Sequence, residues 1–278
     1  RFVTHGREGR PYIKDGRMYF TFSARFFSSV TGVGSLDAAH PERGVRFEGV
    51  ILYDYGDGLL RNDQAPHLFY DDETGEWRGW VCNFSTGTAA LSKRADGGVN
   101  AVWSRKSPLH GLSVMKAKPL GLSGMNEDPC GVWDASAKKW RMFLCSFGEG
   151  DIRAQMLESD RWDGGYAKIT ERVAENSTGT TITWLGSRSY CLSGSSDRAY
   201  YVYSYPDLKK LGSLDMTPTP WGEAKGGPHG RGWPALAELP GGSPHKCILL
   251  TMDRVNFPGM PSPNWTYGAL QIYIADRN

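Results

Sequence analysis

The sequence of 278 residues contains no long hydrophobic run. No apolar stretch comes near the roughly 18 residues that a membrane-spanning helix needs, so we expect no membrane span. A strong charge of either sign is also missing: the formal net charge is +2 at pH 7, which argues against a nucleic-acid-binding or membrane-binding protein. The motifs G-x-S-x-G and H-E-x-x-H and the P-loop are absent, so nothing indicates a serine hydrolase, a zinc protease or a nucleotide hydrolase.

Cysteine is scarce and forms no paired motif. The five cysteines are far apart in the sequence, and no C-x-x-C occurs. Most of them lie within apolar runs, which predicts buried free thiols. The sequence begins with Arg1 and not with a methionine, and we expect a secreted or periplasmic protein whose signal peptide has been removed.

Glycine and aromatic residues are abundant. The sequence has 35 glycines, and 12% of its residues are aromatic, including ten tryptophans. Glycine-rich turns between aromatic-rich stretches are typical of β-proteins. The hydrophobic fraction of 40% is ordinary for a folded globular chain of this length. We therefore expect an all-β protein forming one large domain.

A repeat supports this expectation. Five segments share a short apolar stretch, a polar turn and a longer aromatic-rich stretch; they begin at Arg10, Ala65, Asp128, Arg188 and Trp233. Four of them have a proline at the second position (Pro11, Pro66, Pro129 and Pro234), and the fourth segment has Ser189 there. The number of residues from the start of one segment to the start of the next matches one four-stranded antiparallel sheet per repeat. This repeat predicts a five-bladed β-propeller. The approximate blades are 1–62, 63–125, 126–180, 181–226 and 227–278, and a β-sandwich is the alternative.

The residues just before the shared proline are expected to gather at one end of the central channel. In a propeller the first strand of each blade lines this channel, so all five blades deliver side chains to one place. The expected ring contains four carboxylates, three arginines, one tryptophan and two nearby histidines: Glu8, Asp63, Glu127, Asp128, Arg10, Arg188, Arg231, Trp233, His67 and His229.

This combination of side chains suits the hydrolysis of a glycosidic bond. That reaction needs one carboxylate as base or nucleophile and one protonated group as acid on the two sides of the sugar. The arginines Arg10, Arg188 and Arg231 could bind hydroxyl or anionic groups, His67 could contact substrate, and Trp233 could stack on a sugar face. The alternative is structural, because an acid before a strand often caps a turn and arginine–aspartate pairs often only stabilise a fold.

One segment resembles a known group of enzymes. The stretch "EDPCGVWD", followed by "KKWRMFL", closely resembles the R-D-P segment and hairpin of glycoside hydrolase family 32. The layout of the whole chain resembles the five-bladed propeller glycosidases of families 43, 32, 62 and 117, without indicating one of them. The resemblance implies that Asp128 orients the substrate and stabilises the transition state. It also implies a glycosidase with an inverting mechanism that needs no cofactor.

Two departures from these families leave the acid and the base open. Arg10 stands where the first blade of these families has an aspartate, so the resemblance implies Glu8 or Asp63 as the base. The stretch "LGSRSYCL" lacks the glutamate that families 43 and 32 have in the fourth blade. The acid is then Glu127 or a histidine, as proposed for family 117, with His229 or His67 in that part.

Two other functions remain open from the sequence. A polysaccharide lyase would use an arginine such as Arg10, Arg188 or Arg231 to neutralise the carboxylate of a uronate. A sugar-binding propeller without catalysis would repeat one motif in every blade, whereas these five differ. In each case the partner is a carbohydrate, neutral or anionic. The prediction also allows a structural calcium ion in the central channel.

Overall fold

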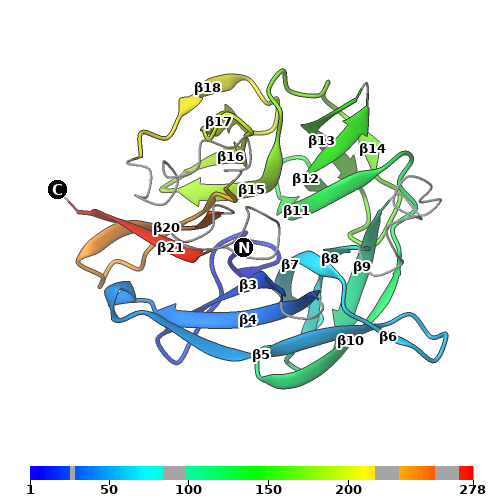
Figure 1. Ribbon diagram of the computed structural model, residues 1–278, viewed down its shortest axis with the longest axis horizontal. Coiled ribbons are helices and arrows are strands. Elements are labelled where there is room, and N and C mark those ends of the chain that lie inside the picture. Colours follow the sequence, from blue (N-terminus) through cyan, green and yellow to red (C-terminus); the bar gives the residue numbers. More distant parts are fainter. Residues whose placement is uncertain (26–28, 84–97, 149, 217–231, 254–268, 278) are drawn as a thin grey trace, which may run out of the picture.

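The computed structural model consists almost entirely of β-strands, arranged as sheets around a central channel (Figure 1). It describes residues 1–25, 29–83, 98–148, 150–216, 232–253 and 269–277. Within these ranges the only helical element is one 3-10 turn, η1 (Pro41–Arg43). The sheets follow one another around the ring in chain order, and Arg1 lies at its centre (Figure 1). The predicted all-β propeller fold is therefore confirmed, and the sheet arrangement is compatible with five blades.

We call the five groups of strands blades 1 to 5. Blade 1 contains β1 (Thr4–His5), β2 (Ile13–Lys14), β3 (Arg17–Arg25), β4 (Ser29–Asp37), β5 (Val45–Asp54) and β6 (Leu60–Arg61). Blade 2 contains β7 (Gln64–Asp71), β8 (Glu76–Cys82), β9 (Val99–Ser104) and β10 (Gly111–Pro119). Blade 3 contains β11 (Asn126–Asp134), β12 (Lys139–Gly148), β13 (Asp151–Ser159) and β14 (Ala167–Lys168). Blade 4 contains β15 (Thr178–Leu185), β16 (Arg188–Gly194), β17 (Tyr200–Ser204) and β18 (Lys210–Ser213), and blade 5 contains β19 (Ala235–Glu238), β20 (His245–Asp253) and β21 (Ala269–Asp276).

Blades 1 and 2 form one ten-stranded sheet. Their outermost strands, β5 and β10, pair in parallel, and β1 pairs in parallel with β7 near the channel. Blades 3, 4 and 5 are separate antiparallel sheets. Four hydrophobic clusters join blade 1 to blade 2, blade 2 to blade 3, blade 3 to blade 4 and blade 5 to blade 1. The last of these contains Phe20 and Ile248. The ring is thus closed by burial of apolar side chains between its first and last blades.

Three inner strands begin with the same irregularity. The ladders of β7, β11 and β15 each shift register at a bulge. The residue at the bulge has a left-handed backbone in each case, with φ of 55° at Ala65, 57° at Asp128 and 61° at Gly179. A bulge leaves backbone groups outside the ladder and turns them toward new partners. The end of the channel at which these strands begin is called the mouth below.

The structure corrects the predicted start of the fourth blade. Its inner strand is β15, which begins at Thr178, so the division expected between residues 180 and 181 falls inside this strand. Arg188 begins the second strand, β16, and pairs with Leu185 at the turn that closes the hairpin. Gly179, and not Arg188, is therefore the residue of blade 4 that corresponds to Asp128.

Small residues allow adjacent blades to approach closely. The thiol of Cys82 in β8 accepts a hydrogen bond from the Asp128 amide over 3.0 Å, and Cys145 in β12 donates to the Ser177 carbonyl over 3.4 Å. Gly194 in β16 occupies the corresponding place in blade 4, where a Cβ would lie 1.9 Å from the Gly232 carbonyl oxygen. As predicted, all five cysteines are free thiols, and four of them are buried.

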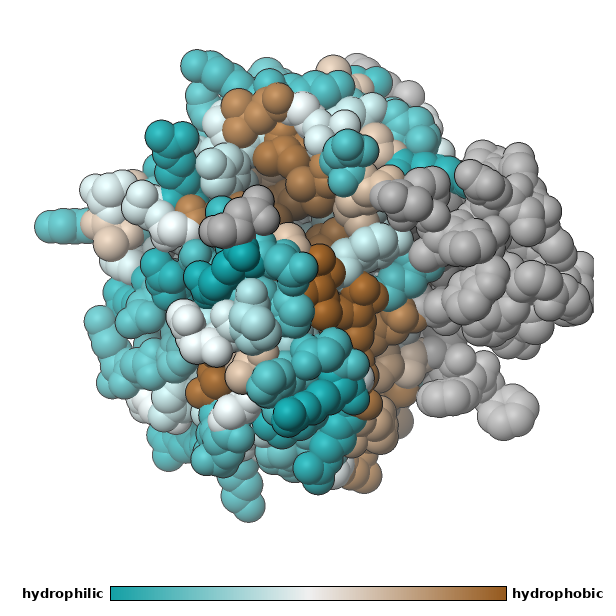
Figure 2. Space-filling view, turned by 90° about the vertical axis from the view of Figure 1, so that its left-hand side faces the viewer, coloured by the Kyte–Doolittle hydropathy of each residue, from teal (hydrophilic) through white to brown (hydrophobic). Residues whose placement is uncertain are grey.

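The outer surface alternates between polar and apolar areas. Figure 2 shows the side of the ring that carries β21, where hydrophobic residues reach the surface in separate areas between polar ones. Leu211 in β18 and Leu270 in β21 are 58% and 42% exposed. Among the described residues no helix is long and apolar enough to cross a membrane.

Candidate active site

Asp128 is a buried carboxylate held at the mouth by groups of two other blades. It is 1% exposed, and its Oδ2 accepts hydrogen bonds from the Thr178 hydroxyl over 3.0 Å and from the Gly179 amide over 2.8 Å. Its main-chain amide donates to Cys82, and its carbonyl accepts from the hydroxyl of Thr180. Groups from blades 2 and 4 therefore fix a residue of blade 3. Charge-assisted hydrogen bonds of this kind stabilise a buried carboxylate.

Arg1 lies directly beside these strand starts. Its Nε donates to the Thr180 carbonyl over 2.8 Å, one terminal nitrogen to Ala65 over 3.2 Å and the other to Asp128 over 2.9 Å. The guanidinium also lies over the ring of Trp233, 5.3 Å from its centroid. One buried cation therefore contacts the entry turns of blades 2, 3 and 4 and an aromatic ring that precedes blade 5.

Trp233 reaches Asp128 through Thr178. The indole Nε1 donates to the Thr178 hydroxyl over 3.2 Å, and this hydroxyl in turn donates to the Asp128 carboxylate. The indole also fills the space beside Gly179, where a Cβ would lie 2.4 Å from the ring. Trp233 and Asp128 therefore lie at the same end of the channel.

Two further predicted carboxylates lie at the beginning of inner strands. Asp63 immediately precedes β7, is fully buried and accepts a hydrogen bond from the Tyr55 hydroxyl. Burial, together with the charge of Asp63, raises the pKa of the Tyr55 hydroxyl well above its usual value. Glu127 is half-buried next to Asp128 and pairs with Cys145 in the ladder of β11 and β12. These positions are consistent with the expected ring.

Three predicted residues lie at the other end of the channel, and their expected place at the mouth was wrong. Glu8 lies exposed in the turn after β1. Arg10 donates to the Gly186 carbonyl over 3.3 Å, and Arg188 lies at the same turn of blade 4. Gly186 follows the last residue of β15, so this turn is about 25 Å from the beginning of that strand.

The error at Arg10 has a simple cause. The inner strand of blade 1 is interrupted: Phe2 bridges Phe20, and Thr4 bridges Pro11. The chain between Thr4 and Pro11 makes an excursion that is absent from the other blades, so the proline of blade 1 is not equivalent to Pro129.

His67 is a buried part of the channel wall. It is 2% exposed; its Nδ1 accepts from the Gly131 amide over 3.1 Å, and its Nε2 lies 3.2 Å from the Thr4 hydroxyl. Burial, aided by the positive charge of Arg1, lowers the pKa of His67 to about 3. The ring is therefore neutral at physiological pH, and since Nδ1 accepts, its proton is on Nε2.

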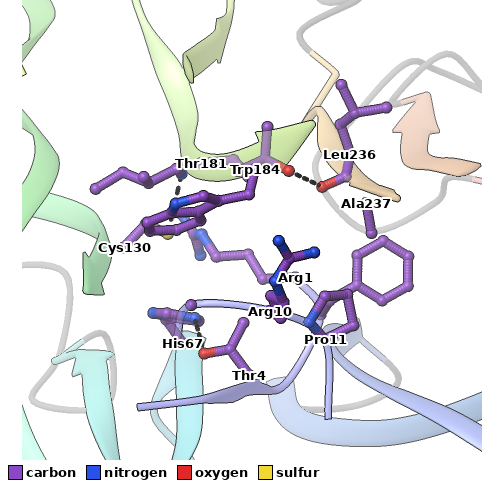
Figure 3. Close-up of a pocket in the computed structure, with 14 residues that line it drawn as sticks. Arg1, Thr4, Arg10, Pro11, His67, Cys130, Thr181, Trp184, Leu236 and Ala237 are labelled. Carbon is purple, nitrogen blue, oxygen red and sulfur yellow. Dashed lines mark hydrogen bonds between the residues drawn. The ribbon is translucent and has the colours of Figure 1, made fainter. Parts of the chain in front are cut away.

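Below Arg1 the channel contains a small cavity (Figure 3). Its volume of about 30 Å³ leaves room for one or two water molecules. The wall is formed by the inner strands of all five blades, with Thr4, His67, Cys130, Thr181 and Ala237 among its residues. This space is too small for a sugar ring.

The remaining predictions are only partly covered by the structure. His229 and Arg231 lie outside the described residues. Within the described part of the chain, no three or more histidine, cysteine or acidic side chains are grouped so that they could hold a metal ion. The structural calcium ion stays a prediction.

Sequence reasoning missed Arg1, Thr178, Gly179 and Thr180. The signal available for the last three was the hairpin itself: "ITWLGSRSYCLSG" aligns with "GVWDASAKKWRMFLCSF" when the turns are superposed, without a shared proline. Arg1 carries no such signal, because its role depends on carbonyl groups from three other blades.

Comparison with known proteins identifies the fold. No family model and no curated protein matches the sequence, but solved structures do. An exo-β-1,3-galactanase from Phanerochaete chrysosporium superposes with a TM-score of 0.60 at 13% identity, over 99% of this chain and 61% of its own. A thermostable family-43 glycoside hydrolase gives 0.60 at 11% identity, over 95% of this chain and 88% of its own. The catalytic domain of a family 62 α-L-arabinofuranosidase from Coprinopsis cinerea gives 0.57 at 13% identity, over 98% and 91%.

These similarities define a class by its architecture. The chain has the fold of the propeller glycoside hydrolases, as the resemblance to families 43 and 62 predicted. At such low sequence identity, the similarity shows a shared fold and nothing further. The chain spans about three fifths of the length of the galactanase.

Proposed function

We propose that this protein is a glycoside hydrolase that cleaves a glycosidic bond of an oligo- or polysaccharide, with inversion at the anomeric carbon. The observation that supports this most is the place of Asp128. It is a buried carboxylate at the start of the third inner strand, in a fold shared with several glycosidases. A residue needed only to begin the strand would not require an acid, since Ala65 and Gly179 hold the same left-handed position in blades 2 and 4.

Each carboxylate at the mouth has a part in this proposal. Asp128 orients the sugar and stabilises the positive charge that develops on the ring in the transition state. Glu127 is the acid, because it lies beside Asp128 and is only half-buried. Asp63 is the base, and the hydroxyl of Tyr55 orients its carboxylate. Glu8 is withdrawn from this part because of its place at the other end of the channel, and His229 is the alternative acid.

The same geometry weakens the proposal of a lyase. Two of the three arginines that could neutralise a uronate, Arg10 and Arg188, lie away from the mouth. A purely sugar-binding propeller would need similar sites in several blades, whereas Asp128, Ala65 and Gly179 differ in chemistry. A carbohydrate substrate, neutral or anionic, and a secreted or periplasmic location remain parts of the proposal.

The test is product analysis on a panel of plant, algal and host glycans. We expect release of reducing sugars without the ultraviolet absorbance of an unsaturated uronate. Asp128→Asn should lower kcat by about 10²- to 10³-fold, the usual loss when a group that stabilises transition-state charge is removed. The matched control is Asp160→Asn, which changes a carboxylate that is 80% exposed and pairs only with Lys139 among the described residues. Full turnover by Asp128→Asn would overturn the proposal, and so would an unsaturated product.

A further inference from the structure

Arg1 has an unusual set of partners for a buried arginine. Within the described residues its guanidinium donates to three main-chain carbonyls and forms no ion pair with a carboxylate. A buried charge without a counter-ion is costly unless dipoles solvate it. Here the carbonyls of Ala65, Asp128 and Thr180 do so, and the ring of Trp233 covers the guanidinium. Three carbonyl oxygens that converge in this way form a cation site, which the protein fills with its own side chain.

The carbonyls are available because of the bulges. At each bulge the inner strand leaves its ladder, so its carbonyl needs another donor. Asp128 has the left-handed backbone that non-glycine residues adopt only at a cost, with φ at 57°. The 2.9 Å hydrogen bond from Arg1 to its carbonyl helps to hold that conformation, and the carboxylate is attached to the same backbone.

We propose that Arg1 is a positioning residue: its guanidinium is a built-in cation that clamps the entry turns of blades 2, 3 and 4 and thereby holds the Asp128 carboxylate in place. The part of this inference that concerns hydrolysis rests on the proposed function. The cation site itself does not.

The experiment removes the Arg1 guanidinium by mutation and then supplies free guanidinium in solution. Arg1→Ala should lower Tm by about 5 to 10 °C through loss of three charge-assisted hydrogen bonds. Guanidinium at millimolar concentration should restore much of this loss in Arg1→Ala and leave the parent protein unchanged. Urea has the same shape without the charge, and it should have no such effect. Arg105→Ala, which removes an arginine that is 90% exposed, is the matched control.

Activity then tests the positioning. At a temperature where every variant is fully folded, kcat of Arg1→Ala should fall at least tenfold with little change in KM. Arg1→Lys should recover only part of it, because one ammonium group cannot reach three carbonyls with a planar fork. Guanidinium should raise kcat of Arg1→Ala together with its Tm.

The outcomes separate the two ideas. A Tm of Arg1→Ala equal to that of the parent, or equal restoration by urea and guanidinium, would overturn the cation site. If guanidinium restores the Tm of Arg1→Ala but the variant has the same kcat as the parent, the positioning role is overturned. The proposed hydrolysis would not be affected by that result. If the parent hydrolyses none of the glycans while guanidinium still restores Tm, the proposed function fails and with it the catalytic part of this inference, but not the cation site.

Discussion

Trp233 and Asp128 are joined through a single hydroxyl group. Thr178 accepts a hydrogen bond from the indole of Trp233 over 3.2 Å and donates one to the Asp128 carboxylate over 3.0 Å. Two blades therefore determine the orientation of a side chain that belongs to a third.

Thr178→Val should weaken the hold on Asp128. The change keeps the shape of the side chain and removes the hydroxyl, so a buried carboxylate loses one donor and the indole loses its acceptor. We expect a loss of about 1.5 to 3 kcal/mol in the free energy of unfolding and a drop in kcat. Urea denaturation and glycan turnover measure the two effects. Thr178→Ser retains the hydroxyl and should behave like the parent; if the two variants are indistinguishable, the hydroxyl has no such role.

Gly194→Ala should force blades 4 and 5 apart. A Cβ at this position would lie 1.9 Å from the main-chain carbonyl of Gly232, which cannot move aside as a side chain could. Overpacking of this kind costs about 1 to 3 kcal/mol or more, which should appear as a lower Tm. Gly241→Ala is the control, because a Cβ there meets nothing within 4 Å. Equal Tm values for both variants would show that Gly194 does not need to be a glycine for blades 4 and 5 to pack.

His67 should make the fold sensitive to acid. Its pKa in the folded protein is about 3, below the roughly 6.5 of an exposed histidine, so the unfolded chain binds the proton more tightly. This contribution to stability is complete above pH 6.5 or so and is lost progressively as the pH falls toward 3. His67→Gln should be less stable at pH 7 but should lose less stability between pH 7 and pH 4. Parallel stability curves for the two proteins would show that His67 does not titrate as described.

His245 should act in the opposite direction. It lies between Glu42 in η1 and Asp276 in β21, at 3.3 and 2.6 Å, and so links blade 1 to blade 5. The hydrogen bond with Asp276, followed by that with Glu42, raises the pKa of His245 above its usual value. Protonation then favours the folded state, so this contribution is complete below about pH 6.5 and disappears as the pH rises through the raised pKa.

The check is the Tm of His245→Gln against that of the parent. The variant should melt at a lower temperature near pH 5.5, and the difference should vanish at alkaline pH. The other charged groups near His245 are the same in both proteins. They are His40, Arg43 and Asp37 in blade 1, and Lys246 beside His245 itself. If the difference in Tm is the same at every pH, packing of the His245 ring and not its charge stabilises this contact.

The fold could be predicted largely from hairpins that are local in the sequence. The turn at Asp15 and Gly16 is an example: both residues have positive φ, as such a turn demands, and β2 and β3 pair across it. The segment from Asp128 and the one from Trp233 likewise form the paired strands expected of them. In these cases the signal and the structure involve the same few residues.

The site was predicted less completely because a proline served as the common marker. Pro66 and Pro129 follow the left-handed residue of a bulge, but in blade 4 the same backbone is formed by Gly179 and Thr180. Glycine adopts this conformation freely, so no proline was needed there and the pattern shifted to Arg188. The role of Arg1 depends on three distant carbonyls, which no local pattern records.

The pairing of β5 with β10 has a consequence for the way the molecule opens. Together with the β1–β7 pair and the bridge between Phe2 and Phe20, it lets hydrogen bonds run from blade 1 to blade 2 at both the inner and the outer rim. The outer strands of blades 3 and 4, β14 and β18, are short and exposed, and among the described strands they pair only inward. Blades 1 and 2 should therefore exchange their amide hydrogens as one cooperative unit, while blades 3 and 4 fray from the outside. On opening, blades 1 and 2 would therefore separate from the rest of the ring together, because hydrogen bonds join them at both the inner and the outer rim.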